Sequence, residues 1–274
     1  MRLRVFATIL ALIVVVGCAP NAAPTESSSP MPVVQEPSAT NPPTETESGS
    51  QSQPEAENLA SFDELGITVG FDYPEGFSQG ISTSFNGVFT PNAPYDLPYP
   101  QNAQILFSAY SGGFGYTVNG LRVFRADEVN ALETGAVENV NAVLEGADHH
   151  TDFPRLPGAG SIIDAQVIPV AFQNGNGYRY LVAKSFSADP ISNTSMAYMY
   201  QGVSNDGKYF VSFIMFVDAP FLAPYVGKAL TTPEEFEAYF QEVNNLVETS
   251  SGDQFTPSLT MLDELISSIV ILEK

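Results

Sequence analysis

The fold class is decided by the stretch Lys208-Tyr209-Phe210-Val211-Ser212-Phe213-Ile214-Met215-Phe216-Val217. Successive side chains of a β-strand point to opposite faces of its sheet, and both alternating sets of this stretch are apolar. One set comprises Tyr209, Val211, Phe213 and Met215, and the other comprises Phe210, Ile214 and Phe216. A strand that is buried on both faces needs a layer of structure on each side. The stretch therefore predicts a sheet that is covered on both faces.

Three more strand-like runs precede this stretch, at residues 161–172, 178–187 and 195–203. The connecting turns are short and rich in Asn, Asp and Gly: Asn174-Gly175-Asn176-Gly177, residues 189–193, and Asn205-Asp206-Gly207. Short turns of this composition between strands are typical of antiparallel hairpins. The four runs therefore predict an antiparallel meander.

Alternating segments nearer the N-terminus predict four further strands, at residues 67–73, 81–85, 105–110 and 121–125. Residues 90–102 contain four prolines, and proline removes the N–H donor that a strand contributes to its ladder. We therefore expect that segment to form a loop.

Three segments have helical spacing. Asp127 can cap a helix over residues 128–144, although Gly135 weakens it. Thr232-Pro233-Glu234-Glu235 matches a capping box with proline at the first helical position. Thr256-Pro257 begins a last amphipathic helix. Together the segments predict an α+β fold, with one antiparallel sheet of about six or seven strands covered by helices.

Short motifs at both ends of this region resemble a known fold family. One is Phe71-Asp72-Tyr73-Pro74-Glu75-Gly76-Phe77, and the other runs from Phe255-Thr256-Pro257-Ser258-Leu259 through Leu262-Asp263 and Ile266 to Ser268-Ile269. Together they resemble the PsbP-like α/β/α sandwich proteins, over most of residues 62–272. The resemblance implies an assembly or accessory role and carries over no catalytic residue. The insert at residues 91–100 and the helix after Asp127 depart from the family pattern, which puts a shared binding surface in doubt.

The middle of the chain has a second resemblance, to uncharacterised secreted bacterial lipoproteins. It rests on the residues 172–181, on Tyr200-Gln201-Gly202 and on Asp206-Gly207-Lys208-Tyr209. The resemblance implies an extracytoplasmic protein and assigns no activity.

Composition excludes several classes of protein. The chain has 274 residues, with 31 acidic against 10 basic ones and a net charge of −21. Nucleic-acid affinity comes mostly from clustered Lys and Arg, so we expect no nucleic-acid partner. One cysteine and two histidines exclude an internal disulfide, a multi-thiolate zinc site and a multi-histidine metal centre. No cofactor is predicted.

Residues 1–18 have the features of a secretory signal. Arg2 and Arg4 precede an apolar run at residues 5–16, which is shorter than the roughly 20 residues of a spanning helix. Val15-Val16-Gly17-Cys18 then resembles the bacterial lipobox. In that family the signal is cut between the residues corresponding to Gly17 and Cys18, and the cysteine carries a diacylglycerol and further fatty-acyl chains such as palmitate. The alternative is a plain signal peptide with an incidental cysteine.

The lipobox resemblance implies an extracytoplasmic protein that is anchored to the cell membrane through lipid on Cys18. Ala19 follows the cysteine in place of the aspartate that signals inner-membrane retention, so the outer membrane is open to the protein in a cell with two membranes. Residues 19–58 follow, with eight prolines, seven serines, four threonines and six glutamates but no aromatic or basic residue. Such a segment is expected to be a disordered tether, and residues 59–274 a single globular domain.

The strongest local candidate for metal chemistry is Asp148-His149-His150-Thr151-Asp152. Two imidazoles and two carboxylates suit a divalent cation if the backbone folds around it. The alternative is a solvated loop at the end of the preceding helix. Gly-x-Ser-x-Gly, Walker and dinucleotide-binding motifs are missing from the sequence, so no catalytic residue is assigned.

Two proline-stiffened aromatic loops are the candidate binding face. Tyr95 and Tyr99 lie in the first, and Pro220-Phe221-Leu222-Ala223-Pro224-Tyr225 is the second. Proline lowers the entropy lost on association, and tyrosine supplies amphipathic contact area. The alternative is that these aromatic side chains fold back over the edge of the sheet.

We therefore expect a non-catalytic binding or accessory lipoprotein with an envelope protein as its partner. An extracytoplasmic hydrolase that uses carboxylate chemistry is the alternative, because acidic residues are frequent throughout the chain. A small-ligand binder for a transporter is a third hypothesis, and the absence of two α/β lobes in the sequence pattern disfavours it.

Overall fold

A computed structural model describes residues 56–90, 98–108, 120–149, 153–154, 156, 160–185, 190–192 and 196–274. The chain divides into two units, Met1–Ser50 and Gln51–Lys274, and every described residue belongs to the second. Cys18, Gly17 and residues 19–55 of the tether lie outside the described residues, and the last tether residue, Asn58, begins β1 (Asn58–Phe62).

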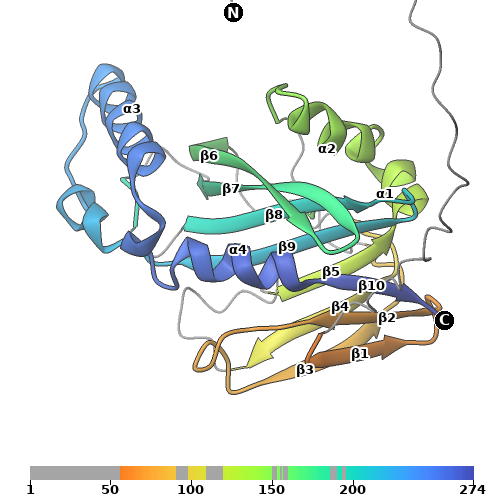
Figure 1. Ribbon diagram of the computed structural model, residues 1–274. Helices are drawn as coiled ribbons and strands as arrows, with labels where there is room; N and C mark the ends of the chain where they lie inside the picture. The colour runs from red at the N-terminus through yellow and green to blue at the C-terminus, as the bar shows by residue number, and fades with distance from the viewer. Residues whose placement is uncertain are drawn as a thin grey trace, which may run out of the picture. The chain divides into compact units, whose positions relative to one another are not determined.

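A seven-stranded antiparallel sheet forms the centre of the domain, in the order β3-β4-β5-β9-β8-β7-β6 (Figure 1). Its strands are β3 (Gly80–Asn86), β4 (Asn102–Ser108), β5 (Gly120–Arg125), β6 (Gly160–Phe172), β7 (Gly175–Ser185), β8 (Met196–Ser204) and β9 (Tyr209–Val217). β6 to β9 pair in succession, which confirms the predicted meander. The predicted α+β class is also confirmed.

Strand β9 lies in the middle of this sheet and is buried along its whole length. Tyr209, Val211, Phe213, Met215 and Val217 belong to one hydrophobic cluster, and Phe210, Ile214 and Phe216 belong to the other. The two alternating sets therefore face two separate cores, as the sequence pattern predicts.

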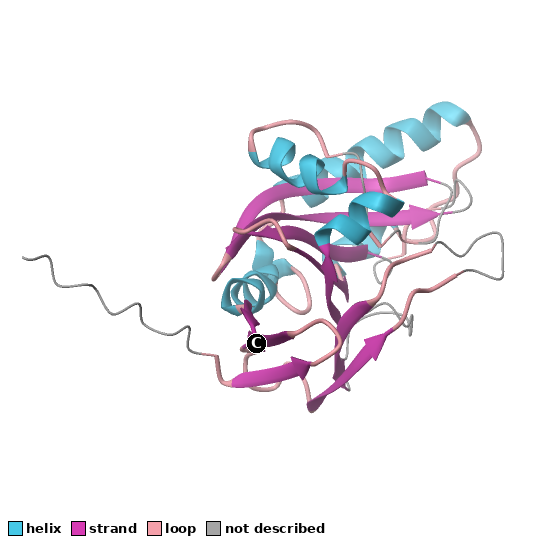
Figure 2. Cartoon of the chain, turned by 90° about the vertical axis from the view of Figure 1, so that its right-hand side faces the viewer, coloured by secondary structure: helices cyan, strands magenta, loops and turns pink. Residues whose placement is uncertain are grey.

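The larger core, which contains Phe213, lies between the sheet and a layer made of helices and a second sheet. That layer consists of α3 (Pro233–Thr249), α4 (Leu259–Ser268) and a three-stranded sheet of order β1-β2-β10 (Figure 2). The small sheet is formed by β1 (Asn58–Phe62), β2 (Ile67–Phe71) and β10 (Val270–Glu273). Two short 3₁₀ helices, η1 (Pro220–Tyr225) and η2 (Gly252–Gln254), complete the chain on this side.

The smaller core, which contains Phe210, lies on the opposite face under α1 (Ala126–Leu132) and α2 (Ala136–Leu144). The sequence predicts one helix capped by Asp127, and that prediction is wrong. Gly135 has φ 86° and separates two helices, and Arg125 is the N-cap residue of the first. Glycine adopts this left-handed conformation without the steric cost of a Cβ, so the helix breaks there.

The prediction of a single sheet is incomplete, because the sequences of β1 and β10 show little of the apolar–polar alternation that predicts a strand. β10 pairs with β2 across about two hundred residues of sequence, and β1 flanks β2 on its other side. Ser268, at the end of α4, also bonds to Asp72, which directly follows β2. The Ser268 Oγ accepts from the Asp72 N–H at 2.8 Å and donates to the Asp72 carbonyl at 3.1 Å. The two motifs that resemble the PsbP-like proteins therefore meet in space.

The predicted capping box is confirmed, since Thr232 and Glu235 bond reciprocally at the start of α3. The last helix begins two residues later than Thr256-Pro257 suggests, with Ser258 as its N-cap. None of the helices in the described part of the chain has the length and hydrophobicity that crossing a membrane requires.

The predicted turn at residues 174–177 is wrong in its extent, because Gly175 and Gly177 lie inside β7. Gly177 pairs with Gly202 of β8, and the buried ring of Tyr200 occupies the space that side chains would fill at these positions. A Cβ built at Gly202 would lie 2.4 Å from the Tyr200 Oη. The Tyr200 hydroxyl donates to the Val170 carbonyl at 3.1 Å, which fixes the ring.

We expect Gly202→Ala to lower the free energy of unfolding by about 1–3 kcal/mol, because the added methyl overpacks the site of the Tyr200 ring. Gly160→Ala is the matched control, because a Cβ at Gly160 meets nothing within 4 Å. Chemical denaturation of both variants measures the difference. In a Tyr200→Leu background the Gly202→Ala cost should largely disappear, and an unchanged cost there would contradict the ring-contact explanation.

Candidate functional site

The first aromatic loop packs against the smaller core. Tyr99 stacks on Phe89 with ring centroids 4.8 Å apart, and the Phe89 N–H donates to the Tyr99 carbonyl at 2.9 Å. Tyr99 contacts the cluster beneath α1 and α2. Tyr95 lies outside the described residues.

The second aromatic loop packs against the larger core, on the other face of the seven-stranded sheet. Phe221 makes an edge-to-face contact with Phe255 at 5.2 Å. The Tyr225 hydroxyl donates to Glu242 at 2.8 Å, and the Tyr225 carbonyl accepts from the Tyr239 hydroxyl. Phe221 and Tyr225 lie close together in η1, but the structure does not bring them together with Tyr99, because the central sheet separates the two cores.

The His149 side chain packs against the smaller core and is not part of a solvated loop. Its side chain is 9% exposed, its ring lies 4.4 Å from the Tyr180 ring, and its Nε2 is 2.5 Å from Asp164 Oδ1. Asp148 is exposed, and His150 and Asp152 lie outside the described residues. Among the residues that the structure describes, no three His, Cys, Asp or Glu side chains are grouped as metal ligands.

A buried charged cluster that the sequence analysis missed joins β6, β7, β8 and α4. Arg179 is the centre of this cluster: its Nη1 donates to Gln166 Oε1 at 2.9 Å and to the Gln166 carbonyl at 3.2 Å. Its Nε lies 3.4 Å from Asp263 Oδ1, which also accepts from the Tyr198 hydroxyl at 2.8 Å. The guanidinium carbon lies 6.0 Å from the Tyr198 ring centroid, so the ring adds a cation–π contact.

Gln166 connects this cluster to the end of α3. It has φ 55°, at a register shift between Ala165 and Ile168 where β6 bulges away from β7. Its Nε2 donates to the carbonyls of Val247 at 2.7 Å and Ser250 at 2.9 Å, at the C-terminal end of α3, where the Val247 carbonyl also accepts from the Ser250 N–H. Its own N–H donates to Glu248. The bulge therefore places the Gln166 side chain where it caps the C-terminal end of α3, although the two are distant in sequence.

Electrostatics at Asp263 are dominated by burial. Burial raises the pKa of the Asp263 carboxyl above its usual value, although Arg179 and the Tyr198 hydroxyl act in the opposite direction. Burial, and then the nearby Asp263 charge, also raises the pKa of Tyr198. A carboxyl with a raised pKa can act as a general acid, but both neighbours here are ordered protein groups that bind its oxygen. The arrangement is therefore suited first to holding α4 on the sheet.

A signal for this cluster does exist in the sequence. Arg179 occupies the same alternating set as Leu181 and Ala183, both fully buried, so a charge stands where the strand pattern requires an apolar side chain. Buried charges in proteins are paired, which predicts a carboxylate partner without saying which one. Choosing Asp263 among 31 acidic residues required the tertiary structure.

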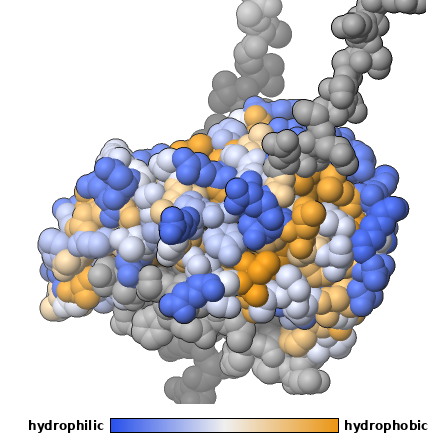
Figure 3. Space-filling model, turned by 60° about the horizontal axis from the view of Figure 1, so that its bottom comes forward, coloured by the Kyte–Doolittle hydropathy of each residue, from blue (hydrophilic) through white to orange (hydrophobic). Residues whose placement is uncertain are grey.

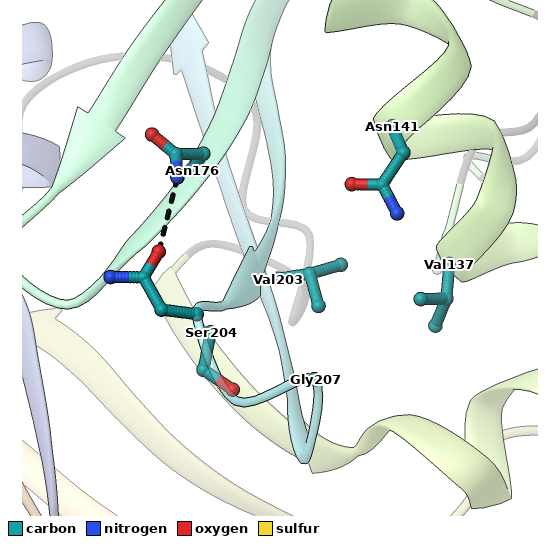
Figure 4. Close-up of a pocket in the computed structure, with 7 residues that line it drawn as sticks. Val137, Asn141, Asn176, Val203, Ser204 and Gly207 are labelled. Atoms are coloured by element: carbon teal, nitrogen blue, oxygen red, sulfur yellow. Dashed lines mark hydrogen bonds between the residues drawn. The ribbon is translucent and has the colours of Figure 1, made fainter.

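A surface pocket of about 240 Å³ lies between α2 and the hairpin turns of the sheet (Figure 4). Its lining residues are Val137, Asn141, Asn176, Val203, Ser204, Asn205 and Gly207. Asn176 donates to Asn205 at 3.1 Å, and the Ser204 hydroxyl donates to Asp206 at 2.6 Å. None of the described lining residues is ionisable, so they offer neutral hydrogen-bonding groups and no acid or base.

Comparison of the chain with protein-family models, with curated proteins and with solved structures gave no match.

The raised pKa of Asp263 predicts in which direction stability changes with pH, and denaturation at several pH values can check that direction. In the unfolded chain the carboxyl titrates near 3.8, so between that value and the higher folded value the folded state retains a proton that the unfolded state loses. The contribution of Asp263 to stability therefore falls as pH rises through this window. We expect the free energy of unfolding of the wild type, minus that of Asp263→Asn, to decrease from about pH 3 to about pH 7.

Glu264→Gln is the matched control for that titration, because it removes an exposed carboxylate from the next position of α4. Urea denaturation at several pH values measures all three proteins. The same trend for both variants would assign the effect to the net charge of the chain, and a difference that increases with pH would contradict the direction of the Asp263 shift.

Proposed function

We propose that this protein is an extracytoplasmic lipoprotein, anchored through lipid on Cys18, whose folded domain is a non-catalytic binding or accessory module. In a cell with two membranes, the residue after the cysteine, Ala19, favours the outer membrane. An envelope protein is the proposed partner, and the PsbP-like resemblance supports the same accessory role.

The observation that carries the non-catalytic proposal is that the polar groups described above bind to other elements of the fold. Arg179 forms an ion pair with Asp263, which holds α4 against the sheet, and Gln166 caps α3. His149 pairs with Asp164 and packs on Tyr180. Each of these groups connects one element of the fold to another, which is what a stable binding scaffold requires.

The anchoring half of the proposal rests on the lipobox resemblance and on the position of the single cysteine. Cys18 is the only thiol in the chain, and it follows the apolar run directly after the small residue Gly17. Only a thiol can form the thioether to diacylglycerol. The acidic chain, at −21, is repelled by anionic lipid, so the lipid would hold a domain that does not itself adhere to the membrane surface.

The hydrolase hypothesis has one group in its favour, Asp263, because burial raises its pKa. Crosslinking on intact cells, followed by mass spectrometry of what the tagged chain captures, separates the two functions. A binding module should recover a reproducible envelope partner with Asp263→Asn as well as with the wild type. Product released from envelope material by the wild type but not by Asp263→Asn would favour the hydrolase.

Cys18→Ser should release the protein from the membrane, because serine cannot carry the thioether-linked lipid. Gly17→Ala is the control, since it keeps a small residue before the cleavage site. Detergent phase partitioning and intact mass should show an acylated, membrane-bound product for the wild type and Gly17→Ala, and loss of both for Cys18→Ser. Membrane attachment that survives Cys18→Ser would favour the incidental-cysteine alternative.

A further inference from the structure

Strand β3 is an edge of the seven-stranded sheet that has no protecting feature within the strand. It reads Gly80-Ile81-Ser82-Thr83-Ser84-Phe85-Asn86 and pairs residue by residue with β4, without a register shift. The strand contains no charged residue and no proline. Proteins usually guard an edge with charge, proline, a bulge or a covering element, because its free N–H and C=O groups can pair with another strand.

The opposite edge, β6, is guarded in each of these ways. It has two register shifts and contains Pro169 and Asp164. Helix α3 covers part of it: the Asp164 N–H donates to Asn244 at 2.9 Å, and the Gln166 N–H donates to Glu248 at 2.5 Å. The same sheet therefore ends in one edge whose backbone donors have partners on a helix and in another that is plain.

The outward-facing residues of β3 can be assigned from its first residue. The Gly80 N–H bonds to Ser78 Oγ at 3.2 Å, beside the strand, rather than to β4. Backbone groups of alternate residues in an antiparallel edge strand point the same way. Gly80, Ser82, Ser84 and Asn86 therefore direct their N–H and C=O groups away from β4.

We infer that β3 pairs antiparallel with β3 of a second copy of this chain, about a two-fold axis at Thr83. This register places Ser82 of each copy opposite Ser84 of the other. Those are the outward-facing residues, so each pair can exchange two N–H···O bonds. Such an isologous contact closes on itself and joins two seven-stranded sheets into one.

The side chains are self-complementary in the same register. Ile81 and Phe85 are half-buried and extend the larger core toward the edge, and each faces the other residue across the axis. Ser82, Ser84 and Asn86 lie on the opposite, polar face, where Asn86 donates to Gln104 at 2.9 Å. Thr83 faces Thr83 of the second copy, and paired threonines are favourable across strands.

Charge within β3 does not oppose a second copy, because the strand itself is uncharged. Residues 59–274 carry 25 acidic residues (31 less the 6 in the tether) and 8 basic ones (10 less Arg2 and Arg4), a net −17. Two copies therefore repel each other in general, while the uncharged β3 sets no like charges opposite one another. Figure 3 shows hydrophilic residues spread among separate hydrophobic patches on the side of the molecule where β1 and β3 lie.

An interface of two short strands is small, so we expect a dissociation constant in about the micromolar range.

Cysteine crosslinking of the full chain tests both the contact and its register. Thr83→Cys places two thiols at the two-fold axis, where Cα atoms of a non-hydrogen-bonded pair are about 4.5 Å apart and a disulfide is feasible. Ser82→Cys is the control one residue away, because its two copies would be about 7–8 Å apart, beyond easy bridging. The wild type reports any bond formed by Cys18. Ser82→Cys mixed with Ser84→Cys should crosslink again.

The expected result is a crosslinked dimer for Thr83→Cys and for the mixed pair, with little for Ser82→Cys alone. Equal crosslinking at residues 82 and 83 would overturn the register. No crosslink at Thr83, together with a monomeric mass for the wild type by sedimentation at about 100 μM, would overturn the dimer. Capture of a different protein at β3 in place of a second copy would also overturn it.

Thr83→Asp supplies a second, independent arm, because it sets two carboxylates opposite each other at the axis. Ser61→Asp is its control, adding the same charge at an exposed position of β1. By sedimentation, Thr83→Asp should lose the dimer while Ser61→Asp keeps it, with unchanged melting temperatures reporting that both fold. Retention of the dimer by a folded Thr83→Asp would overturn the proposal. The inference is independent of the proposed lipid anchor, since Cys18→Ser should leave the β3 dimer intact.

Discussion

The burial of β9 on both faces is the constraint on which the rest of the structure depends. Nine consecutive residues from Tyr209 to Val217 are buried, and they contribute to two cores at once. No single layer can remove both sets of side chains from water, so the chain must supply cover twice. It does so with α1 and α2 on one face, and with α3, α4 and a second small sheet on the other. The second sheet adds to this cover, because β2 contributes Ile67, Val69 and Phe71 to the same core.

Polar groups inside this structure are placed where elements from different parts of the chain must be fixed to one another. Arg179, Asp263 and Tyr198 form such a point between the sheet and α4, and the strained Gln166 forms another at the end of α3. A buried ion pair adds little net stability compared with apolar packing, but removing one partner is costly. The cluster is therefore better understood as a device that specifies how α4 docks than as a source of stability. This use of the buried charges is the physical basis of the proposed scaffold role.

The two edges of the large sheet differ in a way that the core does not require. β6 combines bulges, a proline and helix-derived hydrogen bonds, while β3 is uncharged and regular. An acidic surface keeps copies of the chain apart, and a plain uncharged strand is where that repulsion is weakest. The absence of charge on β3 is what would let a second copy approach this edge despite the net repulsion. The described aromatic side chains of the two proline-rich loops, Tyr99, Phe221 and Tyr225, instead pack partly buried against the separate cores on the two faces.

The sequence by itself determined the α+β class, the meander of β6 to β9 and the capping box at Thr232, because each depends on neighbouring residues and on a short period. It also marked Cys18 as the single thiol behind an apolar run. It did not determine the break at Gly135, the glycines inside β7, or the strands β1 and β10. The glycines inside β7 and the two strands depend on partners elsewhere in the chain: the Tyr200 ring that fills the space beside Gly177, and the pairing of β10 with β2. The same holds for two ion pairs. Packing decides that Arg179 meets Asp263 and that His149 meets Asp164. Local patterns fix which elements form, and only tertiary packing decides which side chains meet, because burial and charge pairing are properties of the assembled layers.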